Sequence, residues 1–198
     1  MLEEMKKENT KNISVLISLA LFVLLFIGCS NTLPTDIYNL RDIGPAGGYI
    51  FYDKGDYSDG WRYLEAAPQS TEWTNVQWGA YGTLVGAWVN DIGTGQSNTN
   101  IIVNWLNYYS ETGRAAQLCD SLTYGGYSDW FLPSYDELHL MYENLKLFGV
   151  GGFADAFYVS STEMNWNGAR GVVFWNGLAA FIEKNSVSDH RIRAIRQF

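Results

Sequence analysis

The chain has 198 residues and a formal net charge of −8 at pH 7, and aromatic residues occupy 16% of its positions. Phosphate binding needs clustered Lys and Arg, so this acidic balance argues against nucleic acid as a partner. About 170 residues remain beyond a leader at the N-terminus, which is enough for one domain with a sizeable core.

The N-terminal segment has the pattern of an export signal. Three lysines within the first 11 residues precede an apolar run over residues 13–28, which ends at Cys29. A basic start, an apolar middle and a small-residue exit predict a signal peptide over residues 1–28. The run is shorter than the roughly 20 residues that a membrane-spanning helix needs, so a permanent transmembrane anchor is the weaker alternative.

The end of this segment resembles the bacterial lipobox. The residues are Phe26-Ile27-Gly28-Cys29, with Phe26 where Leu is usual. The resemblance implies a lipid on Cys29, which would fasten the chain to a membrane of the cell envelope. Ser30 gives no clear signal for retention at the inner membrane, so the outer membrane is preferred. The alternative is a signal anchor in which Cys29 is incidental.

Cysteine usage predicts a domain without a disulfide. If Cys29 carries lipid, Cys119 is the one remaining cysteine and has no partner. Apolar residues around it follow helical spacing, from Ala115 to Leu122. We therefore expect a short helix in which the thiol packs as a small hydrophobic group.

The first half of the mature chain reads as a tether, a hairpin and long loops. Residues 29–43 are mostly polar and suit a tether, and a domain over residues 44–198 follows. Aromatic runs at 49–53 and 61–66, joined by turn residues, predict two antiparallel strands. Residues 69–95 lack periodicity and predict irregular loops.

Two helices are expected in the middle of the chain, followed by strands. One has its apolar side from Ile101 to Tyr109, with a cap at 97–99, and the other begins at a capping box of Ser134 and Glu137. Strands are predicted at 157–161, 171–175, 178–183 and 191–198. Asn176-Gly177 predicts a type I′ hairpin turn. The order indicates an α+β domain whose first and last strands could pair.

Five ordered motifs resemble the Lcl C-terminal domain family, formerly a domain of unknown function. They lie at Gly47–Tyr52, Gly60–Pro68, Asp129–Leu138, Tyr158–Glu163 and Arg193–Arg196. The resemblance spans residues 44–198. It implies a C-type-lectin-like fold, with a mixed antiparallel sheet, two flanking helices and long loops that carry any binding site.

The family's namesake is an adhesin that binds sulfated glycosaminoglycans and forms trimers. This chain is acidic and lacks the collagen repeat, so neither property is carried over. The tether, the aromatic-rich loops and the missing catalytic clusters, together with the lectin-like scaffold, predict a non-enzymatic binding or adhesion domain for a glycan or a host or matrix component. On a regular strand Arg191 and Arg193 point together and Arg196 points oppositely. The candidate ligand-binding residues are Trp73, Trp88, Trp166, Arg191 and Arg193.

Metal, cofactor and enzyme hypotheses find less support. Asp53, Asp56 and Asp59 are spaced by three, unlike a calcium loop, so no metal or cofactor is expected. Residues 130–134 resemble a segment of formylglycine-generating enzymes, but those use paired cysteines. A structural envelope protein that contacts neighbouring proteins, and a divergent enzyme of that kind, remain the alternatives.

Overall fold

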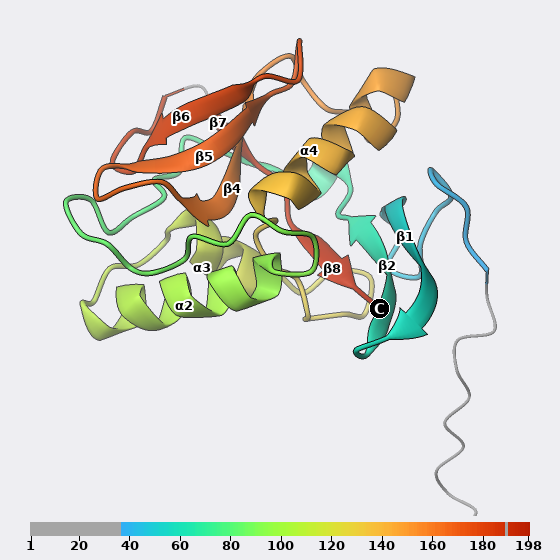
Figure 1. The fold of residues 1–198 in the computed structure, drawn as a ribbon, viewed down its shortest axis with the longest axis horizontal. Helices are drawn as coiled ribbons and strands as arrows, with labels where there is room; N and C mark the ends of the chain where they lie inside the picture. The colour runs from blue at the N-terminus through green and yellow to red at the C-terminus, as the bar shows by residue number, and fades with distance from the viewer. Residues whose placement is uncertain (1–36, 189) are drawn as a thin grey trace, which may run out of the picture. The chain divides into compact units, whose positions relative to one another are not determined.

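Two β-sheets organise the computed structural model, which describes residues 37–188 and 190–198 (Figure 1). The smaller sheet has the order β1-β2-β8 and is made of β1 (Tyr49–Ser58), β2 (Trp61–Ala66) and β8 (Ile195–Gln197). The larger has the order β3-β7-β4-β5-β6 and is made of β3 (Trp73–Thr74), β7 (His190–Ile192), β4 (Phe157–Glu163), β5 (Gly168–Val173) and β6 (Ala179–Glu183). Only β4 and β7 pair in parallel among these strands. The predicted α+β class with a mixed sheet is confirmed.

A two-residue turn closes the hairpin of β1 and β2. Asp59 and Gly60 have φ values of 51° and 87°, both in the left-handed region. Such a turn matches the twist of paired strands, and Asp and Gly tolerate it best. The predicted hairpin is confirmed, although β1 runs past Asp53 through an irregular register to Ser58.

Three α-helices, α2 (Gly95–Tyr108), α3 (Ala115–Asp120) and α4 (Tyr135–Asn144), and two short 3₁₀ turns, η1 (Gln69–Thr71) and η2 (Lys146–Phe148), complete the described elements. The predicted capping box of α4 is present, because the Ser134 amide donates to Glu137 at 2.7 Å and the Glu137 amide donates to Ser134 Oγ at 3.3 Å. Helix α2 begins at Gly95, before the predicted cap. Asn98 and Thr99 lie inside it instead and bond to Val89 O and Leu132 O.

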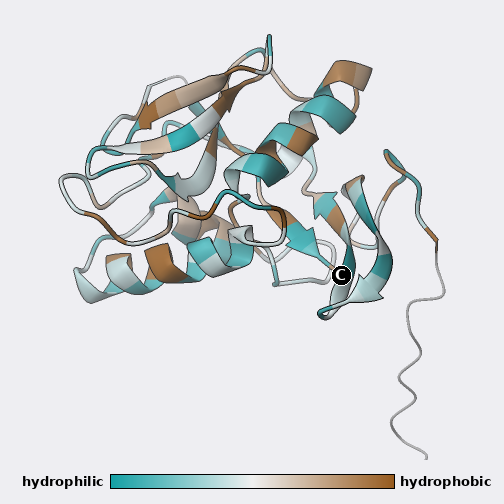
Figure 2. Cartoon of the chain, viewed as in Figure 1, coloured by the Kyte–Doolittle hydropathy of each residue, from teal (hydrophilic) through white to brown (hydrophobic). Residues whose placement is uncertain are grey.

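The helices cover opposite faces of the larger sheet. Helix α4 packs with Tyr158 and Val172, whereas α2 and α3 belong to the cluster that contains Val159 and Ala169. Successive strand residues point to opposite faces, so each layer receives alternate side chains. Figure 2 shows hydrophobic and hydrophilic residues alternating along α2 and α4. Cys119 is fully buried in the α3 layer, as expected, and burial raises the pKa of its thiol.

The C-terminal segment differs from the single strand predicted over 191–198. It divides into β7 and β8, which belong to different sheets. Strand β8 pairs with β2, so β2 separates it from the first strand. The chain changes sheets at Arg193 and Ala194, both buried, and alternation in sequence cannot show such a change of partner.

The turn between β5 and β6 also differs from prediction. Gly177 has a φ of 77°, but Asn176 is not among the residues with positive φ. The amides of Asn176 and Gly177 both donate to Val173 O, at 3.2 and 2.7 Å. A type I′ turn needs positive φ at two residues. The predicted turn type is therefore wrong, although the hairpin that it joins is present.

The compact unit begins at Tyr38, earlier than the predicted start at Gly44. The Arg41 amide donates to Ile50 O at 2.7 Å, and Tyr38 packs edge-on against Tyr63 and Phe198. Part of the predicted tether thus belongs to the fold. The signal peptide and Cys29 lie outside the described residues. No helix within the described ranges is long and apolar enough to cross a membrane.

Candidate functional site

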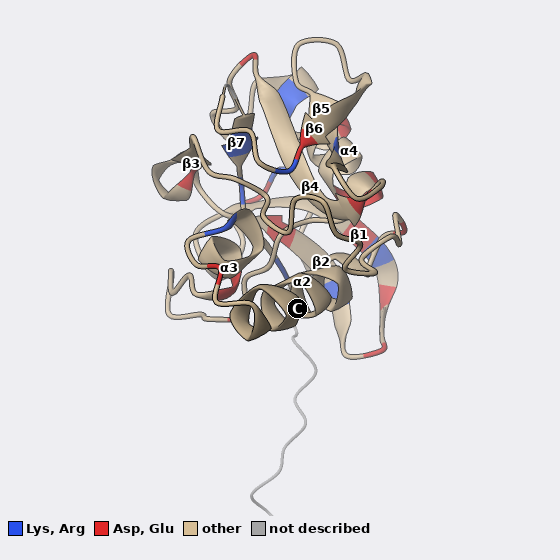
Figure 3. Ribbon diagram, turned by 90° about the vertical axis from the view of Figure 1, so that its left-hand side faces the viewer, with Lys and Arg blue, Asp and Glu red and all other residues tan. Residues whose placement is uncertain are grey.

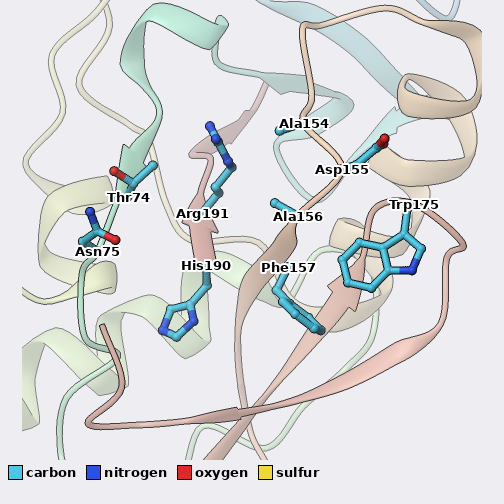
Figure 4. A pocket seen from close by; sticks show the side chains of 9 residues that line it. All are labelled: Thr74, Asn75, Ala154, Asp155, Ala156, Phe157, Trp175, His190 and Arg191. Carbon is cyan, nitrogen blue, oxygen red and sulfur yellow. The ribbon is translucent and has the colours of Figure 1, made fainter. Parts of the chain in front are cut away.

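A pocket of about 520 Å³ opens where β4 and β7 begin (Figure 4). These two strands are parallel, so their first residues, Phe157 and His190, lie side by side in register. The end of β3, the segment before β4 and the turn after β5 supply the other walls. The lining residues are Thr74, Asn75, Ala154, Asp155, Ala156, Phe157, Trp175, His190 and Arg191.

Two aromatic rings form one side of the pocket. The rings of Phe157 and Trp175 meet edge to face, with centroids 5.0 Å apart and planes at 78°. Trp175 follows the buried Phe174 in the turn after β5 and is 50% exposed. Figure 4 shows its indole across the pocket from Arg191. An accessible indole facing polar groups is a suitable surface for stacking a ring-shaped ligand.

Polar side chains form the opposite side. Thr74 of β3 and Arg191 of β7 are register partners. Asn75 follows with a φ of 59°, a conformation that Asn adopts more readily than most residues. At the far rim, Asp155 pairs with Lys146 at 2.7 Å. The pocket therefore offers hydrogen-bond donors and acceptors on more than one wall.

A buried carboxylate beneath the pocket fixes Arg191. The side chain of Glu72 is 4% exposed and pairs with Arg191 Nη1 and Arg193 Nη2. The Tyr158 hydroxyl donates to the same carboxylate at 2.8 Å, and burial raises the pKa of this tyrosine. The bond to Glu72 raises the pKa of Arg191. Two guanidinium groups share one carboxylate, so the cluster has one net positive charge.

Arg191 carries that charge toward solvent, since its side chain is 34% exposed. Arg193 does not reach the pocket: it is buried, and its guanidinium donates to Ala67 O at 3.0 Å and Gly151 O at 2.9 Å. Arg196 points elsewhere and bonds to Asp129 and Glu65. Arg191 and Arg193 thus meet at one carboxylate and Arg196 lies apart, although these residues do not form the single regular strand from which that grouping was predicted. Figure 3 shows the basic colour on β7, beside β3.

The tryptophans chosen from sequence do not gather at this pocket. Trp73 is half-buried in β3 and packs against the core. Trp88 and Trp166 are 51% and 63% exposed, but Trp166 lies in the turn after β4, at the opposite end of that strand from Phe157. Of the five predicted ligand-binding residues, the structure places Arg191 in the pocket wall.

A second buried ion pair lies at that opposite end of β4. Glu163 and Lys184 pair at 2.5 Å, and both side chains are fully buried. Glu163 also accepts the amides of Val85 and Gly86, each at 2.9 Å, while Lys184 donates to Thr83 O at 2.7 Å. Burial lowers the pKa of Lys184. The pair holds residues 79–94, termed the Trp88 loop, against the sheet.

Asp53, one of the carboxylates considered for calcium, and both histidines lie beside other groups. Asp53 accepts two bonds from Arg62, at 2.7 and 2.9 Å, and His190 Nε2 lies 3.1 Å from Ser186 O. His139 lies 3.7 Å from Glu143. Across residues 37–188 and 190–198, no three His, Cys, Asp or Glu side chains converge.

Sequence reasoning missed the aromatic side of the pocket. Phe157 and Trp175 were assigned to strands, where core packing is the ordinary role of an aromatic residue. Trp175-Asn176-Gly177 carried a usable signal, because a tryptophan directly before Asn-Gly belongs to a turn and not to a strand interior. The pairing of β4 with β7, which brings residues 157 and 190 together, left no signal in the local pattern.

Comparison with known proteins gives a likeness of fold. No family model matches the chain, and no curated protein matches it. A crystal structure of a fimbrial protein from Bacteroides ovatus is similar to it, with a TM-score of 0.53 and 13% sequence identity. The match covers 81% of this chain and 46% of the fimbrial protein, so this chain spans about half the length of that neighbour.

Proposed function

We propose that this chain is an envelope-anchored lipoprotein whose domain is a non-enzymatic binding or adhesion module. Its anchor is the lipid on Cys29. Its ligand is a glycan held in the pocket that Trp175 and Arg191 line, termed the Trp175 pocket. The proposal includes membership in the Lcl C-terminal domain family and a C-type-lectin-like arrangement of the two sheets. The outer membrane is the preferred location, because Ser30 gives no clear retention signal.

One observation carries the ligand assignment: an accessible indole stands opposite fixed polar groups. Sugar rings have apolar C–H faces and a rim of hydroxyls, so they suit a site that combines stacking with several hydrogen bonds. Trp175 supplies the stacking surface, while Thr74, Asn75 and Arg191 supply the hydrogen bonds. Glu72 holds Arg191 before any ligand arrives, which lowers the cost of ordering the site.

A glycan array followed by titration tests the ligand assignment. We expect Trp175→Ala to weaken binding of the array hit roughly two- to tenfold, since one stacked ring contributes about 0.5–1.5 kcal/mol. Trp166→Ala is the matched control, because this tryptophan is also exposed but lies at the other end of β4. Equal losses in both variants would contradict the assignment, and so would the absence of any ligand on broad arrays.

Metabolic labelling with a clickable palmitate analogue tests the anchor. We expect the full chain to be labelled and the Cys29→Ala variant to lose the label. Undiminished labelling of that variant would overturn the lipid assignment. Cys119→Ala is the matched control and should keep the label, because the thiol of Cys119 is inaccessible in the core.

A further inference from the structure

The outer edge of the larger sheet is open along β6. This strand is last in the order β3-β7-β4-β5-β6 and has one neighbour, β5 (Figure 1). Hydrogen bonds from Val173 N to Leu178 O at 2.8 Å and from Lys184 N to Asn167 O at 2.9 Å mark the two ends of its ladder. The register between them is unbroken. The direction of every amide in β6 follows from this.

Alternate residues of an antiparallel pair bond to the neighbour and away from it. Ala180 and Ile182 therefore bond to β5, whereas Ala179, Phe181 and Glu183 direct their amides and carbonyls outward. Glu183 O accepts the Ser186 amide at 3.0 Å. In the described parts of the chain, the other outward groups of these three residues have no hydrogen-bond partner.

Three of the devices that normally prevent pairing between copies, namely proline, bulges and exposed lysine, are missing from this edge, and its one charged residue is Glu183 at the end of the strand. The sequence Ala-Ala-Phe-Ile-Glu contains no proline, and Lys184 is buried in its ion pair. The ring of Phe181 packs over Gly168 and still leaves the residue 54% exposed. Leu178, at the start of the edge, is 64% exposed.

We propose that β6 pairs antiparallel with β6 of a second copy of this chain, centred on Phe181. An extended backbone is the ligand that matches alternating free amides and carbonyls. The three outward residues are symmetric about Phe181, so a two-fold axis there pairs Phe181 with itself and Ala179 with Glu183 of the partner subunit. The ladder would contain up to six hydrogen bonds, two for each facing pair, and two of them would use the Glu183 carbonyls that already accept the Ser186 amide.

The charges along β6 and the shortness of β3 at the opposite edge both favour a second copy of this chain as the partner of β6. Glu183 faces Ala179 of the partner subunit, so no like charges stand directly opposite each other. The other edge strand, β3, has two residues, so a head-to-tail contact between β6 and β3 would match far fewer groups. Self-pairing of β6 brings all five of its residues into register and uses the outward groups of Ala179, Phe181 and Glu183.

The interface is small, and we expect dimerisation to be weak in dilute solution. One strand pair and the facing Phe181 rings fall below the roughly 1,200 Å² of standard interfaces. Fastening both copies to one membrane would raise their effective concentration. This last step rests on the proposed lipid anchor; the strand pairing itself does not.

Disulfide trapping of the full chain in its membranes tests the register. Residues that face each other in a hydrogen-bonded pair have Cα atoms about 5.5 Å apart, within disulfide reach. We expect Phe181→Cys to cross-link to itself under copper-phenanthroline oxidation. Ala179→Cys and Glu183→Cys should cross-link when mixed and not when alone. The unsubstituted chain controls for Cys29 and Cys119. Monomers throughout, or self-linking of Ala179→Cys, would overturn the proposal.

A proline variant tests the same contact without added cysteines. Ala179→Pro removes an outward amide and leaves every bond to β5 in place. We expect at least a tenfold weaker dimer by analytical ultracentrifugation, with an unchanged thermal midpoint and unchanged glycan binding. Unaltered association would overturn the strand pairing. Because the Trp175 pocket is intact in this variant, the outcome is independent of the glycan proposal.

Discussion

Each end of β4 is closed by a buried carboxylate that joins segments far apart in sequence, and the two ends differ in how that charge is balanced. At the start of the strand Glu72 serves two arginines, one of which reaches solvent. At its end Glu163 serves one lysine, and neither side chain is exposed. Only the first arrangement leaves a charge free to meet a ligand. The proposed binding site therefore lies at the first end, and the ion pair at the second end holds the Trp88 loop.

The largest expected effect on stability is at the buried ion pair of Glu163 and Lys184. Lys184→Met leaves Glu163 charged and without its cation in the interior, which we expect to lower the free energy of unfolding by about 3–5 kcal/mol. Urea denaturation measures the loss. The double variant Glu163→Gln/Lys184→Met should recover part of it, since no unpaired charge remains. A loss below 1 kcal/mol in the single variant would contradict the role of the pair.

At the pocket end, Glu72→Gln should be less costly. Arg191 is partly exposed, so water can compensate for part of its lost interaction, and the buried Arg193 keeps its bonds to Ala67 O and Gly151 O. We therefore expect about 2–3 kcal/mol of destabilisation. Glycan affinity should fall as well, because Arg191 is no longer held in position. Isothermal titration below the unfolding midpoint separates the two effects. Retained affinity would show that Glu72 has no part in ordering the pocket.

A third buried carboxylate extends the comparison to pH. Glu137, in the first turn of α4, accepts the amides of Gly93 and Ser134, and burial raises its pKa to about 7. The folded chain then binds a proton that the unfolded chain binds only near 4.5. Stability should therefore rise as the pH falls from about 7 toward 4.5, by up to about 1.4 kcal/mol per unit.

Unfolding curves at several pH values measure this slope. The Glu137→Gln variant is its control and should flatten the profile between pH 7 and 5. Burial also raises the pKa of Glu65, which adds a contribution of the same sign that Glu137→Gln leaves in place. Stability that falls steadily with acidification from pH 7 would contradict the raised pKa of Glu137.

The smallest effect is expected at Trp166, in the exposed turn after β4. Trp166→Ala should change the free energy of unfolding by less than about 0.5 kcal/mol, because the residue is 63% exposed. Differential scanning calorimetry of this variant beside Trp175→Ala tests the contrast. A large loss at Trp166 would show that its ring supports the loop and is not simply displayed.

Local signals in the sequence predicted most helices and strands, but they did not show which strands pair with each other. The capping box at Ser134 and Glu137 and the turn residues around Gly60 act within a few positions, so they predicted α4 and the first hairpin. The division of residues 190–198 between two sheets depends on contacts with distant strands. The pocket could not be predicted for the same reason. The charge of Arg191 marked it as a candidate ligand-binding residue, but only the folded β5–β6 turn brings Trp175 to the same pocket.

The placement of β7 has a consequence for how the chain matures. This strand lies between β3 and β4 in the interior of the larger sheet, and β8 completes the smaller one. Neither sheet has all of its strands until residues 190–198 have been synthesised. We expect the nascent chain to remain incompletely folded up to that moment, a state that a translocation channel can accept. Removing these nine residues should leave an open gap between β3 and β4 rather than a trimmed edge.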